Sequence, residues 1–365
     1  MGEDSGTYLR FLELAITHRG VASAFADAAL RHRQMEQAFN ERISETSPDA
    51  AQLRFPHMEL APSQYWQRNF FSILFLSIFD AIGIPEQRQL RYGALLHGIR
   101  GVVTATDNIL DDEAKGSIQL ALAGGSKVLP NVLVMLMESG VVHEAMLDVC
   151  HDRRDMRETW RSLMRALYSL GAEESGEEQA IEHVLSPKDL LDQIHRFRGG
   201  GLLQLAFLAP EINEPHLRTK IGIAKDGINH IGLSLQIIDD ITDFEEDLRR
   251  RNHNMLRSWI VYNQPDGPCE DADLKQLPTE VLKSPEEHLR LATQQVMQLA
   301  IEMALAGFAR LNEVGHPVER SAARELIKTM FKLRGLERLW QVYESSLTSR
   351  QRPPARIDYA QYLPT

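Results

Sequence analysis

The residues best suited to chemistry lie in an acid-rich stretch, LSLQIIDDITDFEEDLRRRN, at residues 233–252. Asp239, Asp243 and Asp247 stand there at positions i, i+4 and i+8, which in a helix places their carboxylates on one face. Like charges at this spacing destabilise a helix by a few tenths of a kcal/mol per pair, so the group needs either solvent or cations. Because Mg²⁺ prefers oxygen ligands, we expect these three residues to bind it. We expect Asp240 to be an alternate ligand or to hold a ligand in place.

A second group of carboxylates, Asp107, Asp111 and Asp112, ends the apolar run YGALLHGIRGVVTATDNILDD. Each group alone also fits a solvated helix face or a network of ion pairs, but each grows out of a strongly apolar helix. Two such groups in one helical chain predict a shared site, where two or three Mg²⁺ ions bind a diphosphate and let it leave. Loss of diphosphate from an allylic carbon gives a carbocation, which needs a dry, apolar cavity.

Helical periodicity dominates the chain, and alternating strand patterns are scarce. Within the acid-rich region one apolar stripe comprises Ile228, Ile231, Leu235, Ile238, Ile241 and Leu248. Clusters of Pro, Gly and Asp interrupt the helical pattern at 45–57, 113–130, 170–187 and 263–285. We therefore predict an all-α fold, a single large helical bundle around a central cavity. We expect an N-terminal helical extension at 1–56, a catalytic domain at 57–349 and a tail at 350–365.

Composition excludes several other classes of protein. The net charge of −11 argues against general nucleic-acid binding. The longest apolar run, residues 70–79, is too short to span a bilayer, so we expect a core helix and no transmembrane segment. Two cysteines, neither in a CxxC pair, indicate a reducing, cytoplasmic compartment. His97, His195 and His230 belong to no HxxxH or HExxH set, and we expect them to be structural.

At the two acidic groups the sequence resembles the class I isoprenoid synthases, all-α enzymes that ionise prenyl diphosphates with Mg²⁺. Gly232-Leu-Ser-Leu-Gln236-Ile-Ile-Asp239-Asp240-Ile-Thr-Asp243-Phe is similar to the GxxFQxxDDxxDF motif of trans-polyprenyl diphosphate synthases. The first group reads DNxxD, with Asn108 where those enzymes have the second Asp of DDxxD. It is also similar to the DxxxDD motif of squalene and phytoene synthases. The second group has the spacing of the metal-binding triad of terpene cyclases, so the resemblance leaves the branch of the superfamily open.

The resemblance implies roles for several other residues. Arg196 and Arg198, in HRFRGGG, are expected to bind the diphosphate, because three glycines would break or kink a helix and expose backbone groups to the ligand. Gln236, Lys115 and Arg250 are expected to contact substrate as well. A basic residue at the end of a helix, such as Arg250, can instead complement the helix dipole. The chain lacks the GGKRxRP and RRG segments that hold isopentenyl diphosphate in chain-elongating relatives.

We therefore predict a Mg²⁺-dependent isoprenoid synthase of the prenyltransferase type, which ionises an allylic prenyl diphosphate and releases pyrophosphate. The predicted catalytic residues are Asp107, Asp111, Asp239 and Asp243. One alternative is a class I terpene cyclase, a lyase that acts on a single prenyl diphosphate. Another is a non-catalytic partner subunit of a prenyl diphosphate synthase. The resemblance also implies a homodimer.

Overall fold

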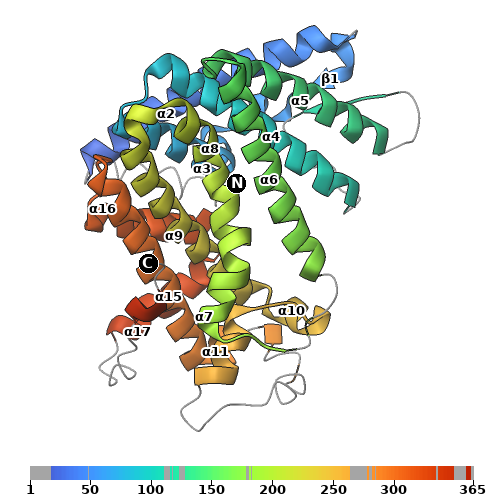
Figure 1. Ribbon diagram of the computed structural model, residues 1–365. Coiled ribbons are helices and arrows are strands. Elements are labelled where there is room, and N and C mark those ends of the chain that lie inside the picture. The colour runs from blue at the N-terminus through green and yellow to red at the C-terminus, as the bar shows by residue number, and fades with distance from the viewer. Residues whose placement is uncertain are drawn as a thin grey trace. The chain divides into compact units, whose positions relative to one another are not determined.

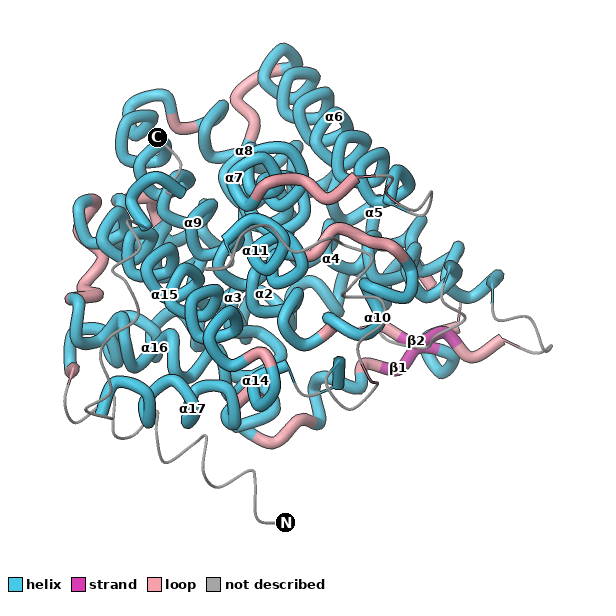
Figure 2. The backbone as a smooth tube through the Cα atoms, turned by 90° about the horizontal axis from the view of Figure 1, so that it is seen from below, coloured by secondary structure: helices cyan, strands magenta, loops and turns pink. Residues whose placement is uncertain are grey.

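The computed structural model describes residues 18–47, 49–110, 116, 118–122, 128–177, 181, 183–263, 278, 282–283, 285–333, 336–348 and 359–362. These residues are overwhelmingly helical. Their strands form one short antiparallel pair, in which β1 (Leu53–Arg54) lies beside β2 (Gln119–Leu120) (Figure 2). The predicted all-α fold is confirmed. No helix in the described ranges is both long enough and apolar enough to cross a bilayer.

The chain, whose helices are labelled in Figure 1, folds into two compact units. Unit 1 comprises the described parts of Met1–Ser162, Ala206–Ile221 and Val314–Pro317. Its complete helices are α2 (Arg19–Thr46), α3 (Pro62–Ile82), α4 (Glu86–Leu110) and α5 (Val128–Val149), with the short 3₁₀ helices η1 (Ala50–Gln52), η2 (Pro56–Glu59) and η4 (Pro215–Leu217). It also includes the start of α6 (Arg153–Glu177), most of α8 (Leu202–Asn213) and the first turn of α9 (Arg218–Thr242).

The apolar run at residues 70–79 lies in α3 and is largely buried, as predicted. The Phe70 ring stacks on Phe25 of α2 at 5.9 Å between centroids, and the Phe79 ring meets Phe207 of α8 edge-on at 5.7 Å. Helix α3 stops at Gly83, whose φ of 96° is the left-handed conformation that glycine adopts most readily. Helix α2, part of the predicted extension, therefore packs in the same unit as α3, and the predicted domain boundaries stay a prediction.

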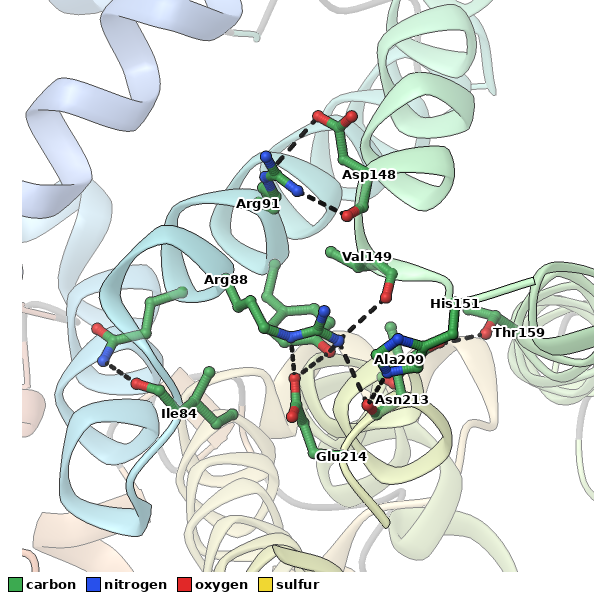
Figure 3. Close-up of polar contacts among 12 residues, drawn as sticks. Ile84, Arg88, Arg91, Asp148, Val149, His151, Thr159, Ala209, Asn213 and Glu214 are labelled. Atoms are coloured by element: carbon green, nitrogen blue, oxygen red, sulfur yellow. Dashed lines mark hydrogen bonds and ion pairs between the residues drawn. The ribbon is translucent and has the colours of Figure 1, made fainter. Parts of the chain in front are cut away.

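A polar network ties α4 to α5 and α8 within unit 1 (Figure 3). The Arg88 guanidinium donates through Nε to the buried Glu214 carboxylate and through Nη2 to the Val149 carbonyl at 3.0 Å. Tyr92 donates to the same carboxylate at 2.9 Å. Asn213 donates to the Ala209 carbonyl at 2.8 Å. Because each partner satisfies a buried charge or amide, the network fixes the register of three helices.

Unit 2 comprises the described parts of Leu163–Leu205, Gly222–Glu313 and Val318–Thr365. Besides the rest of α6, the start of α8 and most of α9, it contains α7 (Pro187–Leu190), the π-helix η3 (Leu191–Gly201), α10 (Phe244–Arg250), α11 (Met255–Asn263), α14 (Pro285–His288), α15 (Arg290–Glu313), α16 (Arg320–Leu333), α17 (Glu337–Thr348) and η5 (Tyr359–Tyr362). Helices α9 and α15 cross closely, since a Cβ added to Gly227 would lie 2.7 Å from the Gly307 carbonyl oxygen.

Helix ends agree with the predicted interruptions at most places. Helix α2 ends at Thr46, α5 begins at Val128, and α11 ends at Asn263, each at a predicted break. Helix α6 instead continues to Glu177, about two turns into the break predicted at 170–187. The Glu-rich sequence there retains good helix formers, which outweigh Gly171 and Gly176.

Candidate functional site

The three aspartates of the second acidic group span the junction of α9 and α10 in unit 2. The predicted helix is not continuous, because α9 ends at Thr242 and Asp243 lies between the two helices. The backbone bonds from Asp243 N to Asp239 O (2.9 Å) and from Asp247 N to Asp243 O (2.8 Å) nevertheless keep helical spacing. The three residues therefore remain about one turn apart. Asp239 and Asp247 are half-buried, and Asp243 is exposed.

The apolar stripe beside these aspartates is buried as predicted. Its members, each at most 7% exposed, are Ile228, Ile231, Leu235, Ile238, Ile241 and Leu248. Burial of this stripe orients α9 and α10, so the backbone positions of the acidic residues next to it follow.

Asp240 points into the protein rather than toward solvent. It is 2% exposed, and its carboxylate accepts hydrogen bonds from Gln236 Nε2 at 3.1 Å and from the Met255 backbone N–H at 2.5 Å. His195 Nε2, on η3, lies 3.0 Å from the same carboxylate. The Asp240 carbonyl accepts a further bond from Asn254 Nδ2 at 2.5 Å. Asp240 therefore joins α9 to η3 and α11, and Gln236 contacts it directly.

Asp247 is held by two asparagines that follow α10. Asn252 Nδ2 donates to Oδ1 at 3.1 Å, and Asn254 Nδ2 donates to Oδ2 at 2.8 Å. Burial raises the pKa of Asp247 to about 6, although the bond from Asn254 lowers it. The neighbouring carboxylates of Asp240 and Asp243 also raise this pKa, so the side chains repel one another. A divalent cation among these carboxylates would relieve that repulsion, and the all-oxygen donor set fits Mg²⁺.

The three glycines of HRFRGGG do not break the helix, contrary to expectation. The segment is the π-helix η3, which continues directly into α8. A Cβ on Gly199 would lie 2.3 Å from the Gly232 carbonyl oxygen, and one on Gly200 would lie 2.0 Å from Asn229 Oδ1. These glycines are needed because η3 packs directly on the α9 backbone. A π-helical turn often marks a functional site, and this one carries His195 to Asp240 of α9.

The predicted basic residues differ in their surroundings. Arg198, on η3, is half-buried. Burial and His195 lower the pKa of His253, and nearby Arg198 adds a smaller effect in the same direction. Arg196 is exposed, and its guanidinium lies over the Phe197 ring at 5.7 Å. Arg250 lies in the last turn of α10 and pairs with Glu246 at 2.6 Å. Arg250 therefore has the ion pair expected of a residue at the end of a helix.

Of the first acidic group, Asp107 is among the described residues, in unit 1. Asp107 is exposed in the last turn of α4. Asn108 is buried, and its amide donates to Asn131 Oδ1 on α5 at 3.2 Å. This bond needs a donor, which a carboxylate at the same position would lack when ionised. The predicted residues Asp111, Asp112 and Lys115 lie outside the described residues.

Sequence reasoning missed the residues that hold the aspartates in place. His195 was expected to be merely structural, and Asn252 and Asn254 were not singled out. The asparagines follow the acidic group within a few positions, in the stretch NHN, and short amides next to a carboxylate cluster are the signal that could have identified them.

Comparisons with known proteins relate this chain to others by structure alone, since no family model and no curated protein sequence matches it. A geranylgeranyl pyrophosphate synthetase from Pyrococcus horikoshii Ot3 superposes with a TM-score of 0.56 at 14% identity, covering 85% of this chain and 98% of that one. A decaprenyl diphosphate synthase from Rhodobacter capsulatus gives 0.58 at 15% identity, covering 87% and 99%. A geranylgeranyl pyrophosphate synthase from Corynebacterium glutamicum gives 0.56 at 14% identity, covering 94% and 100%. The chain has the all-α fold of the isoprenoid synthases.

Proposed function

We propose that this chain, which has the fold of the prenyl diphosphate synthases, is an isoprenoid synthase of the prenyltransferase type. It would ionise an allylic prenyl diphosphate and release pyrophosphate. The observation that carries the proposal is the junction of α9 and α10, where Asp239, Asp243 and Asp247 keep one-turn spacing. The fold alone would not be enough to assign this activity, because one fold can host unrelated activities.

Asp239, Asp243 and Asp247 are the residues that would hold Mg²⁺ in unit 2, and Asp107 is a predicted ligand in unit 1. Mg²⁺ bound there would neutralise the charge on the diphosphate and improve it as a leaving group. Asp240 contributes differently, because its carboxylate is occupied by Gln236 and the Met255 N–H. Its role is to fix the last turn of α9, so that Asp239 faces the substrate.

Arg198 is the basic residue whose position best supports a contact with diphosphate. It is half-buried on η3, the element that His195 joins to α9. Arg196 and Arg250 are both more exposed. Arg198 would therefore provide most of the positive charge for orienting the leaving group.

A terpene cyclase is the second candidate. The observation in its favour is the missing pair of basic segments, GGKRxRP and RRG, because a cyclase uses one diphosphate and needs no site for a second. The unbroken spacing of the three aspartates is compatible with this activity as well.

Incubation with labelled geranyl, farnesyl and geranylgeranyl diphosphates in Mg²⁺, with and without isopentenyl diphosphate, separates the candidates. A prenyltransferase forms longer prenyl diphosphates only when isopentenyl diphosphate is present. A cyclase releases pyrophosphate and an uncharged product without it. If folded protein consumes no substrate in either case, both activities are contradicted. Activity that returns only with an added synthase would then indicate a partner subunit.

A further inference from the structure

A buried cluster of histidine and carboxylate side chains lies in unit 1, apart from the aspartates described above. His32 and Glu36 stand at i and i+4 on α2, and His97 lies on α4. All three are at most 2% exposed. One potential ligand atom from each residue lies within 4.8 Å of the corresponding atoms of the other two. Three residues from two helices therefore point their donor atoms at one small volume.

Several of these donor atoms have no hydrogen-bond partner among the described residues. They are His32 Nε2, Glu36 Oε1 and both ring nitrogens of His97. Each buried polar atom left unsatisfied destabilises the folded state, and native interiors keep few of them. Four such atoms on three adjacent residues indicate that the cluster binds a further group.

Neighbouring side chains fix the orientation of the cluster. His32 Nδ1 lies 2.6 Å from the Tyr65 hydroxyl oxygen and 3.8 Å from Glu36 Oε2, whereas Nε2 has no hydrogen-bond partner among the described residues. His57 Nε2 lies 3.7 Å from Glu36 Oε1 and 3.2 Å from Asn40 Nδ2. Outer hydrogen bonds of this kind set the tautomer and ring orientation of histidines that bind metals.

We propose that His32, Glu36 and His97 bind one transition-metal ion, and that Zn²⁺ suits the site best. Two imidazole nitrogens and one carboxylate oxygen are a common set of protein ligands for Zn²⁺, which binds them at about 2.0–2.2 Å. Mg²⁺ prefers a shell made entirely of oxygens, so this site differs in chemistry from the carboxylates of α9 and α10. Binding would draw the three donor atoms, now within 4.8 Å of one another, closer together by side-chain rotation.

The guanidinium groups around the cluster oppose simple attraction of cations. The guanidinium groups of Arg68 and Arg100 both attract the Glu36 carboxylate electrostatically, and the Glu138 carboxylate attracts Arg100. Arg100 donates to Asn69 Oδ1 at 3.2 Å, so its guanidinium is held by that amide. These guanidinium groups repel any cation, so electrostatic attraction alone would not hold an ion here. Binding must come from coordinate bonds to nitrogen and oxygen, which a transition metal forms strongly.

The ion would connect α2 to the helix that carries the first acidic group. His97 and Asp107 both lie on α4, and ten residues of helix, from 97 to 107, span about 15 Å. The ion would therefore be remote from the exposed Asp107 carboxylate and would act by fixing α4.

Metal content of the purified full chain tests the proposal. Chelator-treated protein is exposed to Zn²⁺, dialysed against buffer containing Mg²⁺, and counted for zinc by mass spectrometry. We expect one Zn²⁺ per chain in the wild type, and a loss of at least tenfold in zinc affinity in His97→Gln and in Glu36→Gln. His316→Gln is the matched control, because His316 is also buried in unit 1 but bonds to Ser77 instead, and it should retain the ion.

Cobalt provides a second readout that does not depend on any variant. Co²⁺ added to the wild type should give the strong visible absorption of four-coordinate cobalt with nitrogen and oxygen ligands, and equimolar Zn²⁺ should abolish it. A wild type that keeps no Zn²⁺ and shows no such band overturns the proposal. Unchanged zinc affinity in folded His97→Gln or Glu36→Gln, judged by circular dichroism, overturns it as well.

Discussion

At the scale of single residues, Asp239 and Asp240 are neighbours in sequence with opposite surroundings. Successive residues of a helix point about 100° apart. Asp239 therefore lies in line with Asp243, whereas Asp240 turns inward to Gln236 and Met255. These two adjacent aspartates thus have different roles: Asp239 is a predicted metal ligand, and Asp240 holds the helix in place.

Asp239→Asn tests the role of the accessible carboxylate. We expect a drop of about 100-fold or more in Mg²⁺-dependent turnover, because metal stabilisation of the leaving group is worth several kcal/mol. Glu246→Gln is the matched control, since it removes the same charge from the same cluster but lies outside the i, i+4 line. Equal losses in both variants, measured by pyrophosphate release, would mean that only the total acidic charge matters.

Glu138 makes stability depend on pH. Its carboxyl packs against Gly101 and is 1% exposed, and burial raises its pKa from 4.5 to about 8. Between these values the folded protein keeps a proton that the unfolded chain releases, so stability falls as pH rises and levels off above pH 8. Glu138→Gln removes this dependence.

We expect the free energy of unfolding of Glu138→Gln to rise relative to that of the wild type from pH 5 to pH 8, by up to about 1.4 kcal/mol per pH unit. Urea unfolding at several pH values measures it. Glu144→Gln, on the exposed side of the same helix, controls for the general loss of an acidic group. Parallel pH curves for wild type and Glu138→Gln would contradict this account.

At the scale of elements, the contact between η3 and α9 depends on backbone-to-backbone packing. Gly199 and Gly232 face each other, and a Cβ on either would lie 2.3 Å from the other's carbonyl oxygen. No side chain can rotate away from such a clash, since the obstructing atom belongs to the backbone. The position of His195 beside Asp240 therefore follows from these two glycines.

Gly232→Ala should separate η3 from α9. We expect a loss of about 1–3 kcal/mol in the free energy of unfolding, together with reduced activity, because the forced shift also moves His195 from Asp240. Gly222→Ala on the same helix is the control, since its added Cβ meets nothing within 4 Å. That variant should gain about 0.5–1 kcal/mol through better helix propensity. Similar effects of the two substitutions on unfolding would contradict the close contact.

At the scale of the whole molecule, the sequence predicts what depends on local periodicity. The stripe from Ile228 to Leu248 is buried because spacing of three and four residues determines a helix face. The run at 70–79 is a core helix for the same reason, and Pro and Gly clusters mark most helix ends. The predicted positions of the aspartates on α9 and α10 likewise follow from local geometry.

Features that depend on contacts between distant segments could not be predicted. The glycines of η3 suggested a break in the helix because their partners, Gly232 and Asn229, are far away in sequence. His97 belonged to no local ligand motif, since its neighbours His32 and Glu36 lie on another helix. Periodicity contains no information about which helices meet, and such contacts require the folded structure.

The central claim is that the carboxylates of α9 and α10 bind a diphosphate through Mg²⁺, and thermal unfolding tests it most directly. Wild-type protein is compared in Mg²⁺ alone, pyrophosphate alone, and both together. At a ligand concentration of about 100 Kd, binding stabilises the folded state by about 2.7 kcal/mol. We predict a rise in Tm only when both are present, and a much smaller rise in Asp239→Asn and Asp243→Asn. No rise in the wild type, or an undiminished rise in both variants, would contradict the claim.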